Sequence, residues 1–264
     1  MRTQQNWVGG SSYNPCSAEY VPPPPELLPE LLSDLYDYVN GDAHSPLVQA
    51  AIAHAQFETL HPFVDGNGRT GRALIHLILR RRGLAPRFLP PISLILATWP
   101  EDYVAGLTHF RHVGPPDSPE RSSAAALWLR TFAAATHRAC VDAQRYTLQI
   151  AELTSSWRAS LGKVRARSSK DLLLRTLPGA PIVTVESASA LIQRSKTRTA
   201  AAIKALTEAG ILRQHNIGRR RNRVFEAEGA LDLFTGLERA LASPTGDTIT
   251  DPPARPAPDR PPRG

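Results

Sequence analysis

Apolar residues recur at helical spacing through most of the first 180 positions, and no alternation of helix and strand interrupts them. In residues 25–39, leucines return every three or four positions, and the segment stops at Asn40-Gly41. Ser45-Pro46 then offers a cap followed by proline at a first helical position. The pattern predicts a mainly α-helical fold for this part. The expected helices cover about residues 25–39, 46–60, 69–82, 100–111 and 122–154.

The two ends of the chain differ from this pattern. Two short apolar stretches, residues 6–8 and 19–21, flank a segment rich in Gly, Ser, Asn and Pro, which predicts a small, loose β-hairpin. At the other end, residues 243–264 hold seven of the 24 prolines and almost no large apolar residues. Such a segment cannot bury enough surface to offset its ordering entropy, so we expect it to be disordered.

The pattern changes near residue 180, where Pro178-Gly179-Ala180-Pro181 indicates a boundary. Beyond it we expect helices at 185–192 and 196–209, then strands at 211–215 and 223–227 around a polar turn. Two helices with a short turn, followed by a basic hairpin, are typical of a winged helix-turn-helix. The expected domains are therefore a helical core at 1–115, a helical continuation and linker at 116–178, the winged helix-turn-helix at 179–242 and the tail at 243–264.

Positive charge is concentrated in the expected winged helix-turn-helix. The whole chain has a formal net charge of +7, whereas residues 194–223 hold nine Arg or Lys and one Glu, a local net charge of +8. In a winged helix-turn-helix this charge favours DNA as a partner, although a winged helix that docks a protein stays open. The candidates for base contact are Thr197 and Arg198, at the start of the second helix. The candidates for phosphate contact are Arg219, Arg220, Arg221 and Arg223.

The rest of the composition excludes several classes. No run of about 18 apolar residues could span a bilayer, and residues 1–10 lack the basic and apolar pattern of a signal peptide. We therefore expect a cytoplasmic protein without a membrane partner. Cys16 and Cys140 lie too far apart for a zinc motif and are too few for a disulfide framework, so both are expected to be reduced.

The segment HPFVDGNGRTGR, residues 61–72, joins two expected helices and gathers residues that carry chemistry. A helix start presents unsatisfied N–H groups, and a glycine-rich turn before it can form a nest for phosphate. The turn consists of Gly66, Asn67 and Gly68. Arg69 and Arg72 are three apart, so they share a helix face and can clamp a polyphosphate.

The first half of this segment supplies the groups for catalysis. Asp65 is placed to hold Mg²⁺, which usually takes one or two carboxylates plus substrate phosphates. The unperturbed pKa of His61 lies near neutrality, which suits it to remove a proton from a hydroxyl. Phe63 lies between them and is interpreted as an apolar anchor for the loop.

The same twelve residues resemble the signature of the Fic (Fido) family, His-x-Phe-x-Asp/Glu-Gly-Asn-Gly-Arg-x-x-Arg, at every fixed position. RTQQNWVGG and YVPPPP also resemble the family's flap. The resemblance implies a Fic-type helical core with a β-hairpin flap that clamps a target segment. It implies AMP transfer from ATP–Mg²⁺ to a Ser, Thr or Tyr hydroxyl of a target protein. A different transferred group, such as phosphate, is less consistent with the intact Asp65 and glycine turn.

Carried over by position, the family roles agree with the interpretation above. His61 would deprotonate the acceptor, Asp65 would bind Mg²⁺, and Phe63 would seat the loop. Gly66, Asn67 and Gly68 would form the anion hole, with Asn67 on the α-phosphate. Arg69 and Arg72 would hold the β- and γ-phosphates. Trp99 and Tyr103 are the candidates for contact with adenine. His54 and His76 lie on apolar helices and are interpreted as structural.

The chain departs from the family in its regulation. Fic proteins are usually inhibited by a Ser/Thr-x-x-x-Glu-Gly/Asn helix whose Glu pairs with the second arginine, here Arg72. This pattern is not found in the sequence. Glu228-Gly229 matches its end, but Val224 occupies the Ser/Thr position. The chain is also short before the flap. A truncated product, a separate antitoxin that supplies the Glu, and an unrestrained enzyme are the three explanations. A DNA-binding regulator with an inactive Fic core is the alternative function.

Overall fold

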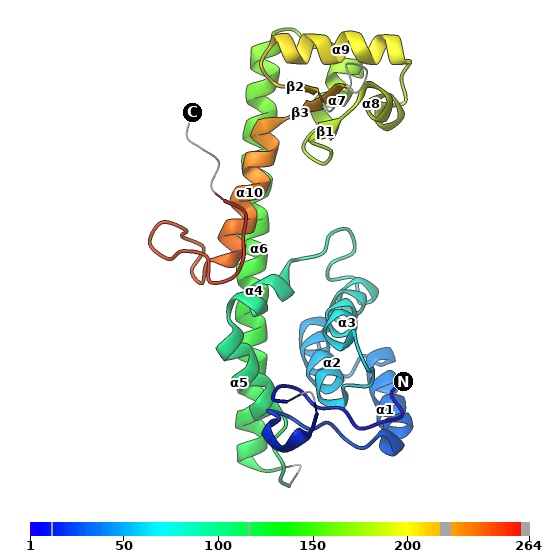
Figure 1. Cartoon of the computed structure of the whole chain (residues 1–264), viewed down its shortest axis with the longest axis vertical. Coiled ribbons are helices and arrows are strands. Elements are labelled where there is room, and N and C mark those ends of the chain that lie inside the picture. Colours follow the sequence, from blue (N-terminus) through cyan, green and yellow to red (C-terminus); the bar gives the residue numbers. More distant parts are fainter. Residues whose placement is uncertain (12, 116, 217–222, 260–264) are drawn as a thin grey trace. The chain divides into compact units, whose positions relative to one another are not determined.

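The computed structural model describes residues 1–11, 13–115, 117–216 and 223–259 (Figure 1). It divides into two compact units, Met1–Cys140 and Val141–Gly264. The described chain is mainly helical, and the second unit contains a small antiparallel sheet. The boundary at residue 140 falls within the longest helix, α6 (Pro119–Leu161), so each unit includes part of it.

Helix α2 (Pro46–Leu60) is the centre of the first unit. It packs on α1 (Leu28–Asn40), on α3 (Asn67–Arg81) and on α5 (Pro100–Phe110). Its small residues allow this close approach, since Ala50, Ala53 and Ala55 are fully buried. The indole N–H of Trp128 on α6 donates to the Ala51 carbonyl at 2.9 Å. A helix that is apolar all round has to be covered on every side, as α2 is.

The remaining elements of the first unit are short. They are the 3₁₀ turns Pro15–Ser17 and Pro25–Leu27 and the helix α4 (Ile92–Thr98). Helix α4 was not predicted, because its apolar run follows Pro90-Pro91 and is too short to show a period. The expected helix at 25–39 begins with a 3₁₀ turn and becomes α-helical at Leu28.

In its described residues, the expected N-terminal β-hairpin is reduced to a single antiparallel bridge. Val8 pairs with Tyr20, and the Val8 N–H donates to the Tyr20 carbonyl at 2.9 Å. Gly9 and Gly10 both have positive φ, at 74° and 71°, so the chain turns away from extended pairing immediately after the bridge. The Tyr20 hydroxyl donates to the Thr59 carbonyl at 2.9 Å, which fastens this segment to α2. We call residues 2–21 the flap segment.

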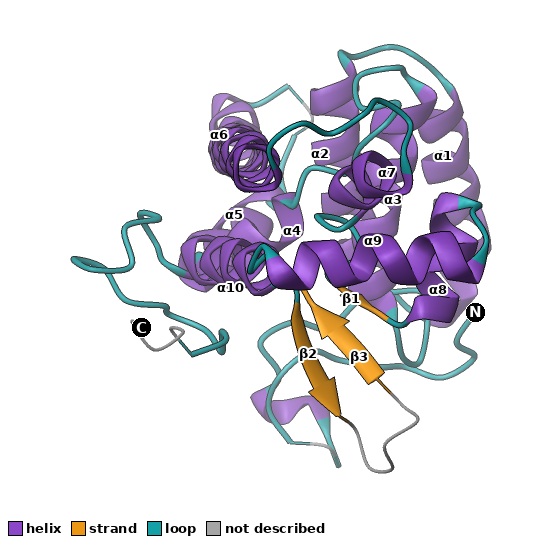
Figure 2. Cartoon of the chain, turned by 90° about the horizontal axis from the view of Figure 1, so that it is seen from above, coloured by secondary structure: helices purple, strands orange, loops and turns teal. Residues whose placement is uncertain are grey.

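The second unit combines helices with a sheet whose strand order is β1-β3-β2 (Figure 2). After α6 come α7 (Ser169–Thr176), β1 (Ile182–Val183), α8 (Val185–Ile192) and α9 (Lys196–Glu208). Strands β2 (Arg213–Asn216) and β3 (Arg223–Glu226) pair antiparallel, with Gln214 opposite Phe225, and α10 (Glu228–Ala242) follows. The two predicted helices and two predicted strands are present within one or two residues; β1, α7 and α10 were not predicted.

The core of this unit extends further back along the chain than the expected boundary at 178/179. Trp157 on α6 and Leu173, Leu174 and Leu177 on and after α7 share one hydrophobic cluster with Ile203 on α9. The segment expected to be a linker therefore contributes to the core. Helix α7 was missed because only eight residues separate its start from the Pro-Gly signal that follows.

The turns around α8 follow from local chemistry. Thr184 and Ser187 form a reciprocal capping box at the start of α8, with the Ser187 N–H 3.1 Å from the Thr184 hydroxyl. Gln193 ends α8 in a left-handed conformation, and the Ser195 hydroxyl accepts from the Arg198 N–H at the start of α9. Two capped helices with a three-residue turn are thereby fixed relative to each other.

Residues 243–259 contain no helix or strand, yet they contact α10 rather than leaving it. The Ala254 N–H donates to the Ala242 carbonyl at 2.8 Å, Arg239 donates to the Pro258 carbonyl at 2.7 Å, and Ser243 is fully buried. The predicted Pro-rich tail thus has hydrogen bonds to the second unit in its described part. Across the described helices, none combines the length and apolar character that a membrane span requires.

Candidate active site

The candidate site begins where α2 ends. The His61 N–H donates to the Phe57 carbonyl at 3.0 Å, and the His61 backbone is left-handed, with φ 45° and ψ 57°. Such a conformation costs a non-glycine residue about 1–3 kcal/mol and persists only where the surroundings impose it. It turns the chain sharply from the helix into the loop that precedes α3. His61 is therefore held by the fold in a backbone conformation that its own preferences disfavour.

The imidazole of His61 is half-buried, and its Nδ1 is buried without a hydrogen-bond partner among the described residues. Burial lowers its pKa from the ordinary value of a histidine; the Glu58 backbone opposes this shift, and the nearby charges of Arg111 and Arg2 add to it. A lowered pKa keeps the ring neutral at pH 7. A neutral imidazole can accept a proton, as the sequence interpretation requires.

Two residues of the flap segment hold the loop after His61, and the sequence did not identify either of them. Arg2 is 3% exposed; its Nε donates to the His61 carbonyl at 3.1 Å, and its backbone N–H donates to the Pro62 carbonyl at 2.8 Å. The Asn6 side chain donates to the Phe63 carbonyl at 3.1 Å. The sequence signal was present in RTQQNWVGG, but it was interpreted as a strand that binds a target and not as a support for the loop.

Asn67 fixes the loop from the other side. Its side-chain oxygen accepts from the Phe63 N–H, and its side-chain nitrogen donates to the Phe63 carbonyl, both at 2.8 Å. Asn67 is 3% exposed, so this pair of bonds is shielded from water. Because both ends of the amide are engaged, the contribution of Asn67 to an anion hole would come from its backbone N–H. Phe63 is half-buried and its ring lies 6.1 Å from that of Phe57, as expected of an anchor.

Gly66 sets the start of α3. It is the residue before the helix, its φ is 86°, and no side chain caps this end. The first N–H groups of a helix have no partner within it, so a capless start leaves them for a ligand. The left-handed conformation of Gly66 is one that glycine adopts without steric cost. The start of α3 at residue 67, two residues earlier than expected, places Gly68 inside the first turn.

Asp65 and Arg69 form an exposed ion pair, with 2.9 Å between a carboxylate oxygen and the guanidinium. The other Asp65 oxygen accepts from the Gly66 N–H at 2.6 Å. No group of three or more His, Cys, Asp or Glu side chains within metal-binding reach occurs in the described residues. A cation at Asp65 would thus be held by one carboxylate and by ligand oxygens, which suits Mg²⁺ on a nucleotide. Arg69 would have to leave Asp65 for the phosphates.

Arg72 is exposed and folds back over the first turn of α3. A Cβ placed on Gly68 would lie 3.0 Å from a guanidinium nitrogen of Arg72, so the glycine makes room for this arginine. Arg69 lies similarly near Gly66, 3.5 Å from the position of a Cβ there. Both guanidinium groups therefore lie against the glycine turn. The structure brings together the expected anion-binding residues at the start of one helix.

A buried polar cluster beneath α3 was missed by the sequence interpretation. Glu58 on α2 is 8% exposed, and one of its oxygens is buried without a hydrogen bond among the described residues. A Cβ on Gly71 would lie 2.5 Å from that oxygen and 3.1 Å from Nδ1 of His54. Gly71 is thus required because Glu58 and His54 fill the space below it. Burial raises the pKa of Glu58, while the charges of Arg72 and Arg111 oppose the rise.

Of the two candidates for adenine contact, Tyr103 packs against buried side chains of the first unit. The Tyr103 hydroxyl lies 3.1 Å from His54 Nε2, and its ring lies 6.0 Å from that of Trp128. Tyr103 is thereby a partner in the buried cluster, with a pKa raised by burial. His54 is 1% exposed and its pKa falls to about 4 because of burial, which agrees with a structural role. Trp99 directly precedes α5.

The candidates for nucleic-acid contact lie in the second unit. Thr197 and Arg198 are exposed in the first turn of α9, and Arg223 is exposed at the start of β3. Arg219, Arg220 and Arg221 lie outside the described residues. The expected basic hairpin is therefore described at its strands and not at its turn.

The first part of the chain is similar in sequence to known proteins. Residues 2–79 match the model of the Fic/DOC family. Protein adenylyltransferase fic-1 of Caenorhabditis briggsae is 41% identical over 93 residues, which are 34% of this chain and 17% of that protein. Protein adenylyltransferase Fic of Drosophila willistoni is 38% identical over 92 residues, with the same two shares. A probable protein adenylyltransferase of Aquifex aeolicus is 40% identical over 68 residues, 25% of this chain and 21% of that protein.

A crystal structure of a Fic family protein from Desulfovibrio desulfuricans G20 superposes with a TM-score of 0.45 at 21% identity, over 86% of this chain and 61% of that one. The chain spans about a fifth or less of the length of the curated relatives named above. The matched segment contains the loop and the helix start described here. Residues 2–79 are therefore similar to Fic/DOC family proteins, and this segment lies in the first unit.

Proposed function

We propose that the first unit transfers AMP from ATP to a hydroxyl of a target protein. The observation that carries the proposal is the start of α3, where an uncapped helix follows a left-handed Gly66 and both Arg69 and Arg72 lie against the turn. Relatives of this segment are named protein adenylyltransferases. In phosphoryl-type transfer, positioning and neutralisation of charge supply most of the catalysis.

The residues of this site divide the work. The acceptor oxygen attacks the α-phosphorus, the bond from that phosphorus to the β-phosphate breaks, and pyrophosphate leaves. His61 takes the acceptor proton; since its Nδ1 is buried, Nε2 is the atom that receives it. The backbone N–H groups of Asn67 and Gly68 bind phosphate oxygens, and that of Gly66 joins them when Asp65, which accepts from it here, releases it. Arg69 and Arg72 hold the β- and γ-phosphates. Asp65 would hold Mg²⁺, which would supply positive charge against the phosphates.

The flap segment is the proposed seat for the target. A hollow of about 410 Å³ is lined by Gln5, Asn6, Trp7, Gly9, Gly10 and Ser11, and Asn6 also contacts the catalytic loop. A target strand that pairs here would place its hydroxyl near His61, as in recognition by strand addition. Arg72 is the proposed point of control, because it is exposed and an antitoxin glutamate could pair with it.

The test is incubation of the full chain with labelled ATP, Mg²⁺ and cell lysate. Labelled protein and released pyrophosphate are expected from the wild type and not from His61→Ala. The matched control is His76→Gln. His76 is also a partly buried histidine, but it lies on α3 and not in the loop, so this variant should keep the activity. Absence of any label that depends on His61 would overturn the proposal. A mass gain other than one AMP unit on the target would assign a different transfer.

A second candidate function rests on the second unit. We infer that residues 169–226 form a winged helix-turn-helix that binds DNA. Helices α8 and α9 with their capped turn precede an antiparallel hairpin, and the exposed face of α9 carries Thr197, Arg198, Ala200, Ala201 and Lys204. Small residues on such a face allow close approach to the major groove, which admits an α-helix.

Binding to duplex DNA from the gene's own upstream region, measured across a salt series, tests this inference. Contacts from Arg and Lys to phosphate predict affinity that falls steeply as salt rises. Thr197→Ala should weaken the preference for particular sequences more than the overall affinity. Affinity that does not change with salt would exclude DNA binding by this unit.

A further inference from the structure

A large basic groove lies in the second unit, at a place that the sequence did not indicate. It has a volume of about 1240 Å³ and is formed by the loop between α6 and α7, the start of α7 and the first turns of α9. Its described lining includes six basic side chains and no carboxylate. We call it the basic groove. Its six basic residues are Lys163, Arg165, Arg167, Lys170, Arg194 and Arg198.

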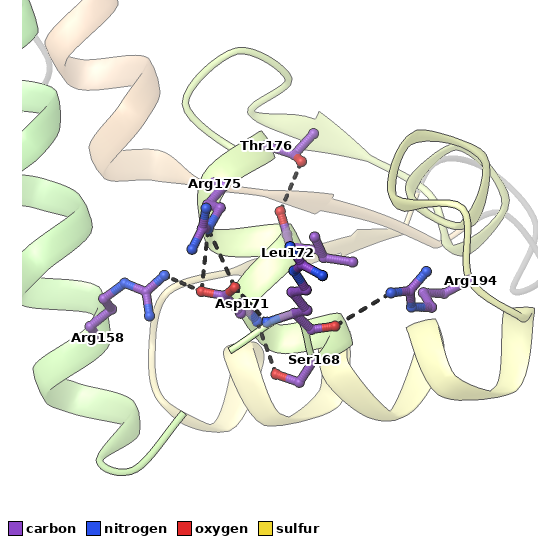
Figure 3. A network of polar contacts seen from close by, with 8 residues as sticks. Arg158, Ser168, Asp171, Leu172, Arg175, Thr176 and Arg194 are labelled. Atoms are coloured by element: carbon purple, nitrogen blue, oxygen red, sulfur yellow. Dashed lines mark hydrogen bonds and ion pairs between the residues drawn. The ribbon is translucent and has the colours of Figure 1, made fainter. Parts of the chain in front are cut away.

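The loop that forms one wall of the basic groove is held rigidly (Figure 3). The carboxylate of Asp171, 1% exposed, accepts hydrogen bonds from the Arg158 guanidinium on α6 and, at 2.9 Å, from the Arg167 N–H. The Arg194 guanidinium donates to the Arg167 carbonyl at 3.4 Å. The Ser168 hydroxyl caps α7 by accepting from the Asp171 N–H. The loop is thereby joined to α6, to α7 and to Arg194 in the turn between α8 and α9.

The charge of the basic groove is not neutralised within the described residues. Asp171 is compensated by Arg158 and Arg175, neither of which lines the groove. The acidic side chains near α9 pair with bases outside the groove: Lys196 with Glu186 at 2.8 Å, and Lys204 with Glu208 at 3.7 Å. Lys163, Arg165 and Arg198 have no ion pair with a described residue. A ligand for this groove is therefore an anion with several charges.

Size and position indicate which anion. The groove is larger than the usual range of about 300–1,000 Å³ for small-molecule pockets, and it is partly open to solvent. It also shares Arg198 with the exposed face of α9. A B-form duplex that receives a helix in its major groove brings a row of phosphates alongside that helix. A-form RNA has a deep, narrow major groove that does not admit a helix.

We propose that the basic groove binds backbone phosphates of duplex DNA beside the major groove that receives α9. The proposal rests on the DNA binding inferred above and adds a second contact surface formed by residues 163–170. These contacts are to phosphate, so they contribute affinity and orientation and carry no information on base sequence. The wall formed by Lys163 and Arg165 is the part that the recognition helix does not share.

The test compares Lys163→Ala/Arg165→Ala with the wild type for binding to several duplexes over a salt series. Both side chains are exposed, so the fold should survive, and urea unfolding of the second unit, followed by hydrogen exchange of α7 and α9, checks this independently. Loss of two phosphate contacts should reduce the slope of log affinity against log salt by about 2. Affinity at moderate salt should fall by about tenfold or more on every duplex.

The matched control is Arg80→Ala/Arg87→Ala, which removes two exposed charges from the first unit and should change neither slope nor affinity beyond about twofold. Equal losses of DNA affinity in both double variants would assign the effect to net charge and would contradict the proposal that the basic groove binds DNA. Unchanged binding by Lys163→Ala/Arg165→Ala, with normal wild-type binding, would overturn the groove alone. A wild type that binds no duplex would overturn the DNA-binding inference together with the groove. Tighter binding to single strands, lost in the variant, would also exclude duplex as the ligand.

Discussion

Helices α3 and α9 both begin beside arginines, but their first turns are built differently. Gly66 precedes α3 in a left-handed conformation and offers no cap, whereas the Ser195 hydroxyl before α9 accepts from the Arg198 N–H. The first start leaves backbone donors for a ligand, and the second uses one of them itself. The start of α3 therefore suits a small, compact phosphate group. At α9, basic side chains are spread over a loop and two helices, an arrangement that suits a polymer with many phosphates.

The comparison predicts that His61→Ala separates the two functions. Removal of a general base lowers the rate by about 10²–10⁴-fold, so AMP transfer should fall by that factor. Affinity for duplex DNA should stay at the wild-type value, because His61 belongs to the first unit. Transfer rates from initial velocities and DNA affinities from the same preparations measure both. A parallel loss of DNA binding would indicate that the variant has unfolded.

The polar cluster beneath α3 predicts a dependence of stability on pH. The pKa of His54 is about 4 in the fold and about 6.5 when unfolded, so the unfolded state binds more protons between these values. The free energy of unfolding should therefore fall as pH drops from about 6.5 to 4, by up to about 3 kcal/mol. Glu58, with a raised pKa, acts in the opposite direction.

His54→Gln should flatten this dependence, as measured by urea unfolding at several pH values. The same substitution at exposed His109 is the control and should leave the wild-type slope. A slope that survives in His54→Gln would assign the dependence to other groups. The cluster packs beneath α3 and not near α9. The pH dependence should therefore appear in the unfolding of the first unit and not in that of the second.

Gly71→Ala should destabilise the first unit by about 1–3 kcal/mol, since a Cβ there would lie 2.5 Å from an oxygen of Glu58. Part of this loss should return in Gly71→Ala/Glu58→Ala, where the obstructing carboxylate is absent. Gly236→Ala on α10, where a Cβ meets nothing within 4 Å, is the matched control and should stabilise by about 0.5–1 kcal/mol. Urea unfolding measures all three. A neutral Gly71→Ala would mean that Glu58 moves freely.

Ser168→Ala should cost about 1 kcal/mol, because the Ser168 hydroxyl caps α7 beside the basic groove. Ser45→Ala is its control: Ser45 precedes α2 and its side chain makes no capping hydrogen bond, so the change should be close to zero. Hydrogen exchange of the first turns of α7 and α2 would measure each helix separately. Equal protection losses at both sites would contradict the distinction between capped and uncapped starts.

The sequence predicted most of the long elements and the residues of the loop at 61–72. Local signals were sufficient there: glycine turns, caps and a helical period act over a few residues. Arg2 and Asn6 were not recognised as supports of the loop, since they contact it from more than fifty residues away. The short helices α4 and α7 were missed because too few residues establish a period.

The sequence by itself determined the chemistry available at the start of α3, because the turn and its arginines are neighbours along the chain. The tertiary structure alone decided that Glu58 and His54 fill the space below Gly71. It alone decided that residues 163–170 join α9 in one basic groove. These arrangements depend on which helices pack together. The sequence pattern of one segment contains no information on which side chains pack against it from other segments.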